Sequence, residues 1–287
     1  MQAPGVHEVI VRHATILRMT ARPAHFTPST EDTFLPTASA QSHWGDDHLN
    51  GPALVGLAAW VLDGRYGDDD FLPTRLTVDL FKAARGVPTV VSTRLIRDGR
   101  RVRTSECELS QDGRPVVRAT MVQYRLSSAP AGEQWRPATT FPHPEVDAAS
   151  YMRMGSDEGG WSDAIADHQN ASRKRFFNRS VDVVDGQCNG PFVDAVMVAE
   201  GTSLVTNLGS AGIGYINGDL TVGLTRLPGD EWIGVQAESH WAQDGIAVGT
   251  ATLFDAMGPF GSGMVTAVSN PAAQIDFTHD QFPSRTP

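Results

Sequence analysis

Two stretches of this chain are strongly hydrophobic, and each follows the same short motif. Asn50-Gly51-Pro52 precedes a run that continues to Leu62, and Asn189-Gly190-Pro191 precedes a run that continues to about Asn207. Asparagine is a common N-cap and proline is tolerated in the first turn, so each motif predicts the start of a helix. A helix that is apolar on every face does not lie on a protein surface. We therefore expect two enclosed helices, each wrapped by a sheet.

Alternating apolar and polar positions predict an antiparallel meander after each helix. The predicted strands of the first half are 75–83, 89–97, 101–110 and 116–126. Those of the second half are 216–226, 232–242, 246–254 and 263–269, with one more strand at 173–184 before the second helix. Three Asp-Gly pairs favour tight hairpin turns between strands: they are Asp98-Gly99, Asp112-Gly113 and Asp244-Gly245.

The order of these elements repeats because the sequence itself repeats. The two Asn-Gly-Pro motifs are 139 residues apart, and Leu76-Thr77-Val78-Asp79-Leu80 returns after 144 residues as Leu220-Thr221-Val222-Gly223-Leu224. Such matches, in one order and at nearly one offset, indicate two copies of one structural unit. The expected organisation is an N-terminal extension at 1–25, a first unit at 26–127, a linker rich in Pro and Ala at 128–172, a second unit at 173–270 and a C-terminal tail at 271–287.

Composition excludes several classes of function. The net charge of −10 argues against binding to nucleic acid or to an anionic membrane. The longest apolar run is well short of the ~20 residues that span a bilayer. Two cysteines, Cys107 and Cys188, are too few for a disulfide scaffold, and residues 1–20 do not resemble a signal peptide, so we expect a cytoplasmic protein. The chain has no H-x-x-x-H or C-x-x-C spacing, and we expect no metal site.

Four segments resemble the acyl-CoA thioesterase II-like family; they are Leu72–Leu80, Thr93–Val102, Gly218–Val222 and Gly229–Trp232. The resemblance extends over both units. It implies an α+β double hot-dog fold, in which the antiparallel sheet of each unit wraps around a long apolar helix. It also implies hydrolysis of acyl-CoA thioesters, or less commonly of acyl-carrier protein thioesters, with no cofactor besides the substrate. Hot-dog sheets often pair edge to edge, which implies a homo-oligomer.

In that family three residues of the second half carry the chemistry: a carboxylate on the helix, a threonine entering the next strand and a glutamine on the last strand. The resemblance places the carboxylate on Glu200, the threonine position on Asn217 and the glutamine position on or beside Val265. Valine offers no side-chain hydrogen bond. A second hypothesis therefore stays open, in which the protein binds acyl-CoA or acts as a scaffold without catalysis.

The residues themselves favour a hydrolytic site. A half-buried Glu200 would have a raised pKa, which suits a general base near neutral pH. The amide of Asn217 could orient a water molecule, and the N–H of Gly190 could polarise a thioester carbonyl at the start of the helix. Each residue also has a structural interpretation, because Glu200 could face solvent, Asn217 could belong to a turn, and Gly190 could simply begin its helix.

Three further candidates are weaker. Asp194 lies in the first turn of the second helix, where the helix dipole favours an anion and a structural role is the simpler interpretation. His240 lies on a central strand, where a histidine is more often packed than catalytic. His48 follows Asp46, and this pair leaves a hydratase or dehydratase as a third hypothesis.

Arginines concentrate in the strands of the first unit. Arg94, Arg97 and Arg101 are our candidates for binding the phosphates of coenzyme A, because the guanidinium group matches phosphate geometry. The alternative is that they lie on a solvated outer face of the sheet.

Overall fold

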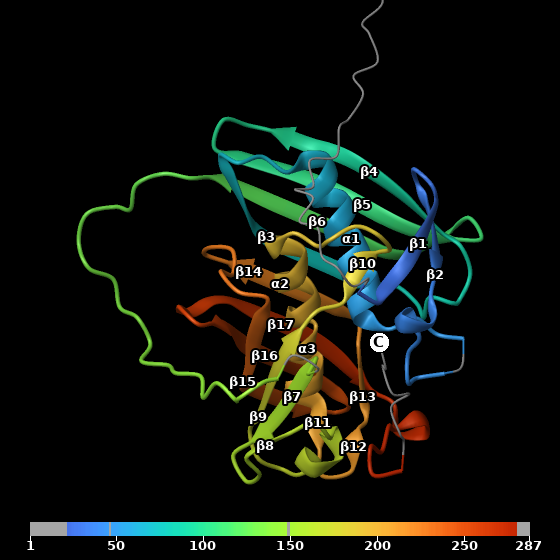
Figure 1. Cartoon of the computed structure of the whole chain (residues 1–287), viewed down its shortest axis with the longest axis vertical. Helices are drawn as coiled ribbons and strands as arrows, with labels where there is room; N and C mark the ends of the chain where they lie inside the picture. The colour runs from blue at the N-terminus through green and yellow to red at the C-terminus, as the bar shows by residue number, and fades with distance from the viewer. Residues whose placement is uncertain (1–21, 46, 148–149, 280–287) are drawn as a thin grey trace, which may run out of the picture.

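The computed structural model describes residues 22–45, 47–147 and 150–279, which form two units that share one sheet (Figure 1). The helices are α1 (Gly51–Tyr66), α2 (Pro191–Ala199) and α3 (Gly201–Asn207), with short 3₁₀ helices η1 (Ala38–Ala40), η2 (Ile165–His168) and η3 (Pro271–Ala273). Strands of the first unit are β1 (Ala24–Thr30), β2 (Thr33–Pro36), β3 (Phe71–Leu80), β4 (Thr89–Asp98), β5 (Val102–Gln111) and β6 (Arg114–Arg125). The remaining strands are β7 (Met152–Ser156), β8 (Trp161–Ser162), β9 (Lys174–Arg179), β10 (Asp182–Val184), β11 (Leu208–Gly209), β12 (Gly212–Ile213), β13 (Tyr215–Asn217), β14 (Asp219–Leu224), β15 (Trp232–Gln243), β16 (Ile246–Asp255) and β17 (Gly258–Ser269).

The repeated segments meet at the seam between the units. Strands β3 and β14 pair antiparallel, and Thr77 stands opposite Thr221. Outward from this pair the sheet order is β3-β6-β5-β4 on one side and β14-β17-β16-β15 on the other. Each strand on one side of the seam therefore has a counterpart at the same distance from the seam in the other unit. The two copies are related by an approximate two-fold axis through the Thr77–Thr221 pair.

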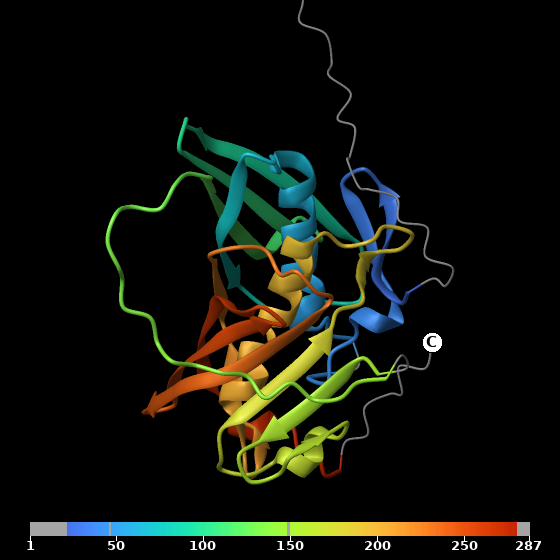
Figure 2. The ribbon, with the colours of Figure 1, turned by 60° about the vertical axis from the view of Figure 1, so that its left-hand side comes forward.

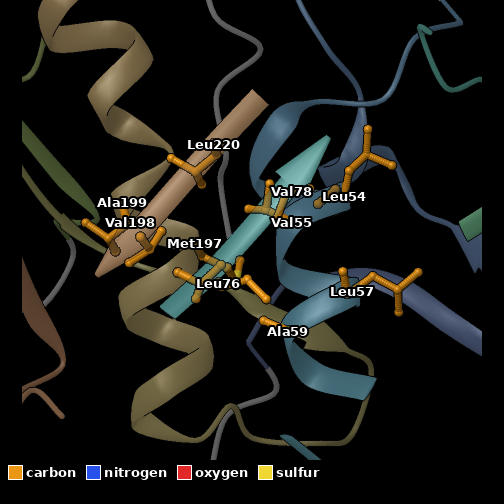
Figure 3. Close-up of a cluster of buried hydrophobic side chains, with 14 of the residues drawn as sticks. Leu54, Val55, Leu57, Ala59, Leu76, Val78, Met197, Val198, Ala199 and Leu220 are labelled. Atoms are coloured by element: carbon orange, nitrogen blue, oxygen red, sulfur yellow. The ribbon is translucent and has the colours of Figure 1, made fainter. Parts of the chain in front are cut away.

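The helices lie against the strands of their own units and side by side at the centre of the molecule (Figures 1 and 2). Their contact is close because Gly56 has no side chain: a Cβ atom there would lie 2.9 Å from Cγ of Met197 and 3.0 Å from Cγ2 of Val183. Leucine, valine and alanine side chains from α1, α2, β3 and β14 fill the surrounding core (Figure 3). This packing explains why the hydrophobic run of α1 is apolar on all faces.

Local sequence explains the ends of several elements. The side chain of Asn50 accepts a hydrogen bond of 2.8 Å from the N–H of Ala53, which confirms the predicted N-cap of α1. In the β15–β16 hairpin, Asp244 has φ of 51° and Gly245 has φ of 79°, as the favoured two-residue hairpin turns require. The strands of the two meanders agree with the predicted ranges to within about four residues, except at the start of β17 and at 216–226, which is divided into β13 and β14.

The second helix differs from the single helix expected over 189–207. It consists of α2 and α3, and Glu200 separates them. The N–H of Ser203 bonds to the carbonyl of Glu200 at 3.0 Å, an i→i+3 pattern that tightens this turn. Gly201 packs closely on β9, because a Cβ atom there would lie 2.9 Å from Cδ1 of Phe176. The break is thus a product of packing against the sheet.

The expected strand at 173–184 is also divided. Its first part, β9, pairs antiparallel with β7 and β15, whereas its second part, β10, pairs in parallel with β1 of the first unit. Residues 180–181 lie between them, where the chain passes from one end of the sheet to the other. Sequence alternation alone does not reveal this crossing, because both parts have the same strand-like pattern.

The segments outside the two expected units are more ordered than predicted. Residues 128–147 form a long connection without a helix or strand, but β7 and β8 occupy 152–162, so this part of the expected linker belongs to the sheet (Figure 1). Strand β1 begins at Ala24, inside the expected extension, and residues 1–21 lie outside the described part. In the tail, Ile275 and Phe277 are buried against the core.

Candidate functional site

Glu200 lies where the two units meet. Its side chain leaves the junction of α2 and α3 and reaches the first turn of α1 in the other unit. A Cβ atom at Gly51 would clash with Oε1 of Glu200 and would lie 2.5 Å from its Cδ. The carboxyl group therefore rests directly on the Gly51 backbone, in space that only glycine leaves open.

Asn217 is the polar partner of this carboxyl group. Its Nδ2 donates a hydrogen bond of 3.5 Å to Oε1 of Glu200. Strand β13 holds Asn217 in register with Ala267 of β17, so the sheet of the second unit positions the amide. The structure thus brings together Glu200 and Asn217, the two residues that we predicted to act on the thioester.

Burial determines the protonation of Glu200. It raises the pKa of the carboxyl group to about 8, against the smaller opposing effect of the hydrogen bond from Asn217. At pH 7 most molecules therefore carry a neutral Glu200, and the carboxylate becomes the main form above about pH 8. A group with this pKa can accept a proton from water and return it to a leaving group within a narrow range of pH.

The first turn of α1 supplies a donor beside Glu200. Pro52 has no N–H, and the N–H of Ala53 is bonded to the side chain of Asn50. The N–H of Gly51 is therefore the donor that this turn can offer, at the positive end of the helix dipole. A proton acceptor, an amide and an N–H at a helix start are together the groups needed for attack of water on a carbonyl carbon.

Gly190, the third predicted site residue, does not lie beside Glu200 and Asn217. It begins α2 and Glu200 ends it, so about 15 Å of helix separates the two residues at 1.5 Å per residue. Gly190 instead lies near Asp63 of α1, since a Cβ atom at Gly190 would lie 3.4 Å from Oδ2 of that residue. The glycine of the same motif in the first unit, Gly51, faces Glu200.

Asp63 is a residue that the sequence analysis missed. Burial raises the pKa of its carboxyl group to about 6. One sequence signal could have identified it: Asp63 is the first acid after the apolar run of α1, as Glu200 is at the end of α2. The antiparallel packing of α1 and α2 brings each of these acids to the glycine that begins the other helix.

Val265 occupies the inward face of β17 and is 1% exposed. It stands opposite Gly249 of β16 and has only an apolar side chain to offer. The position to which the family resemblance assigns a glutamine therefore adds no hydrogen bond to the site.

The three weaker candidates lie in other settings. Asp194 accepts hydrogen bonds from Ser180 and, at 2.9 Å, from Asn189, which fastens the start of α2 to the preceding loop. The ring of His240 contacts Tyr215 edge-on with centroids 5.7 Å apart, and burial lowers the pKa of the imidazole. His48 is held through its main chain, which bonds to Ser42. Its expected partner at position 46 lies outside the described residues.

The candidate phosphate-binding arginines lie on exposed parts of β4 and of the turn that follows it. Arg94 forms an ion pair of 3.0 Å with Glu106, and Arg97 and Arg101 are exposed. Arg101 borders a shallow surface hollow together with Arg100 and Arg125. The pairing of Arg94 with an acid favours the interpretation of a solvated outer face over a phosphate site.

The described residues contain neither a metal-binding group of side chains nor a membrane-spanning helix. Within the ranges given above, no three His, Cys, Asp or Glu side chains are grouped so that they could hold a metal ion. No helix in this part of the chain has the length and apolar character needed to cross a membrane.

Comparisons with known proteins identify the same family in both units. The model of the acyl-CoA thioesterase N-terminal domain matches residues 40–124, and that of the acyl-CoA thioesterase C-terminal domain matches residues 129–267. No curated protein sequence matches the chain.

Solved structures show the same fold at low sequence identity. An acyl-CoA thioesterase II from Mycobacterium marinum has a TM-score of 0.58 and 15% identity, with 91% of this chain and 96% of that chain covered. A tesB protein from Mycobacterium avium subspecies paratuberculosis has a TM-score of 0.59 and 14% identity, covering 86% and 96%. A protein of unknown function with a hot dog fold from Alicyclobacillus acidocaldarius has a TM-score of 0.60 and 14% identity, covering 85% and 95%.

Proposed function

Since the chain belongs to the acyl-CoA thioesterase II-like family, we propose that it hydrolyses acyl-CoA thioesters where Glu200 meets Gly51. One observation carries the proposal: a carboxyl group with a pKa of about 8 rests on the first turn of a helix from the other unit. Asn217 bonds to this group from the adjacent sheet. Family membership supports the substrate class, and the geometry supports the roles of the residues.

The proposed reaction uses these three residues in order. Glu200, as the carboxylate, removes a proton from a water molecule that Asn217 helps to orient. The water oxygen bonds to the thioester carbon, and the N–H of Gly51 stabilises the negative charge that develops on the carbonyl oxygen. The carbon–sulfur bond then breaks, and the proton held by Glu200 passes to the departing thiolate. The products are a carboxylic acid and free coenzyme A.

Val265 gives specific support to a second function, binding of acyl-CoA without turnover. The apolar side chain at this position deprives the site of one polar contact. Tight binding of acyl-CoA measured by calorimetry, without release of thiol, would favour this second function. Measurable turnover that depends on Glu200 would exclude it.

A thiol-release assay with saturated acyl-CoAs of graded chain length tests the proposed hydrolysis. We expect kcat/KM to rise with pH to an inflection near 8, the pKa of Glu200. Glu200→Gln keeps the shape of the side chain but cannot accept a proton, and we expect it to reduce kcat/KM by ~10²-fold or more. Glu106→Gln is the control, because Glu106 lies on β5 and pairs with Arg94 on the outer face of the sheet, away from both helix starts. Equal rates for wild type and Glu200→Gln would remove Glu200 from the mechanism.

A further inference from the structure

The contact between Glu200 and Gly51 has a counterpart at the other end of the helix pair. Asp63, near the end of α1, faces Gly190 at the start of α2, with Oδ2 3.4 Å from the position of a Cβ atom on that glycine. Both contacts join an acid of one unit to the helix start of the other. The approximate two-fold axis of the sheet relates them.

We propose that Asp63 and Gly190 form a second thioester-hydrolysing site, separate from the site at Glu200. This inference rests on the proposed function, since it assigns the same reaction class to the second contact. It changes the expected stoichiometry from one substrate per chain to two.

The helix start at this second contact is more open than that of α1. The N-cap of α2 is Gly190 itself, which has no side chain to cap the first turn. The amide of the preceding Asn189 donates to the carbonyl of Val181 at 2.8 Å and to Asp194 at 2.9 Å, and its oxygen accepts from the N–H of Val183 at 2.9 Å. The first-turn N–H groups of α2 therefore lack the side-chain cap that Asn50 provides in α1, and they can donate to a carbonyl oxygen.

A buried amide lies at the same turn as Asp63. Gln123 of β6 is 1% exposed, and its Nε2 donates to the carbonyl of Tyr66 at 3.1 Å. Its Oε1 is buried without a hydrogen-bond partner among the described residues. Gly67, the residue after Tyr66, lies beside the Asp63 carboxyl group, because a Cβ atom at Gly67 would lie 3.3 Å from Oδ1 of Asp63. An unpaired buried carbonyl costs stability, and a bound water or substrate would satisfy it.

The proposed reaction at this second site follows the same steps as the reaction at Glu200. The carboxylate of Asp63 takes a proton from water, and the resulting oxygen–carbon bond converts the thioester into a tetrahedral intermediate. First-turn N–H groups of α2 stabilise its oxyanion. The carbon–sulfur bond breaks, the thiolate receives the proton from Asp63, and a carboxylic acid remains. Burial raises the pKa of Asp63 to about 6, so this carboxylate is already the main form at pH 7.

Thiol release by Glu200→Gln and by the double variant Glu200→Gln/Asp63→Asn tests the catalytic part of the inference. We expect Glu200→Gln to retain a residual rate whose pH profile has its inflection near 6, the pKa of Asp63. Adding Asp63→Asn should reduce that residual rate by at least ~10-fold. Equal residual rates at every pH in the two variants would overturn the second site. Absence of thiol release by the wild type would instead count against the proposed function itself.

Binding stoichiometry gives an independent test that needs no turnover. Calorimetry of the full chain with a non-hydrolysable thioether analogue of acyl-CoA should show two molecules per chain, and Gly190→Val should reduce this to one. Gly64→Ala is the matched control, because Gly64 adjoins Asp63 on α1 and an added Cβ meets no atom within 4 Å. One molecule per wild-type chain would overturn the inference and leave the site at Glu200 standing. Thermal melts of each variant identify any loss of folding.

Discussion

The two ends of the helix pair use the same backbone arrangement with different side chains. At one end Glu200 is pressed onto Gly51, bonded to Asn217, and has a pKa of about 8. At the other end Asp63 is shorter, lies farther from Gly190, and has a pKa of about 6. The duplication therefore repeats the pairing of an acid with a helix start, while the length and partners of each acid set its protonation.

The largest expected effect is the difference in activity between substitution of Gly51 and substitution of Gly190. Gly51→Ala should displace the Glu200 carboxyl group, because the added Cβ would occupy its space, and we expect kcat/KM at pH 8 to fall by ~10²-fold or more. The same change at Gly190 meets the nearest carboxyl oxygen at 3.4 Å, an ordinary contact, and should leave thiol release at pH 8 nearly unchanged. Equal losses in the two variants would show that the two contacts are equivalent.

Stability should depend on pH differently for the two acids. The folded state holds the Glu200 proton more tightly than the unfolded chain does, so the contribution of Glu200 to stability is fully present below pH 4.5 and is lost as the pH rises to about 8. For Asp63 the decline lies between pH 3.8 and about 6. Glu200→Gln should therefore be more stable than wild type at pH 8 by several kcal/mol, since one pKa unit corresponds to about 1.4 kcal/mol. Urea unfolding from pH 5 to 9 measures this, and parallel curves for the two proteins would contradict it.

The smallest expected effect concerns Asn217, whose hydrogen bond to Glu200 is long at 3.5 Å. Asn217→Ala removes the one hydrogen bond that lowers the pKa of Glu200. We expect the inflection of the pH–rate profile to move upward and kcat/KM at pH 7 to fall by roughly 10-fold. Asn217→Asp offers a contrast, because a second acid beside Glu200 should raise that pKa further. An unchanged profile in Asn217→Ala would limit Asn217 to a structural role.

Much of the fold could be predicted because its signals are local. The start of α1, the Asp244-Gly245 turn and the strands of both meanders follow from residues that act within a few positions of themselves. The break at Glu200 and the division of 173–184 into β9 and β10 could not. They depend on Phe176 packing against Gly201 and on the pairing of β10 with β1, which are contacts between distant segments.

The candidate site, like the fold, could be predicted from the sequence only in part. Resemblance located Glu200 and Asn217, and the structure brings them together. The sequence did not identify Asp63. When the two helices are aligned on their Asn-Gly-Pro motifs, Glu200 matches Val61, which is two residues before Asp63. Only the folded helices show that Asp63, like Glu200, lies beside the glycine that begins the other helix.

By itself the sequence determined that there are two copies of one unit, where most of their helices and strands begin, and which family they resemble. Only the tertiary structure decided which acid meets which glycine. From the sequence we expected Glu200 to act with Gly190, ten residues earlier in the chain, yet the glycine that it contacts is Gly51, 149 residues away. The physical reason is the antiparallel packing of α1 and α2, which places the end of each helix beside the start of the other.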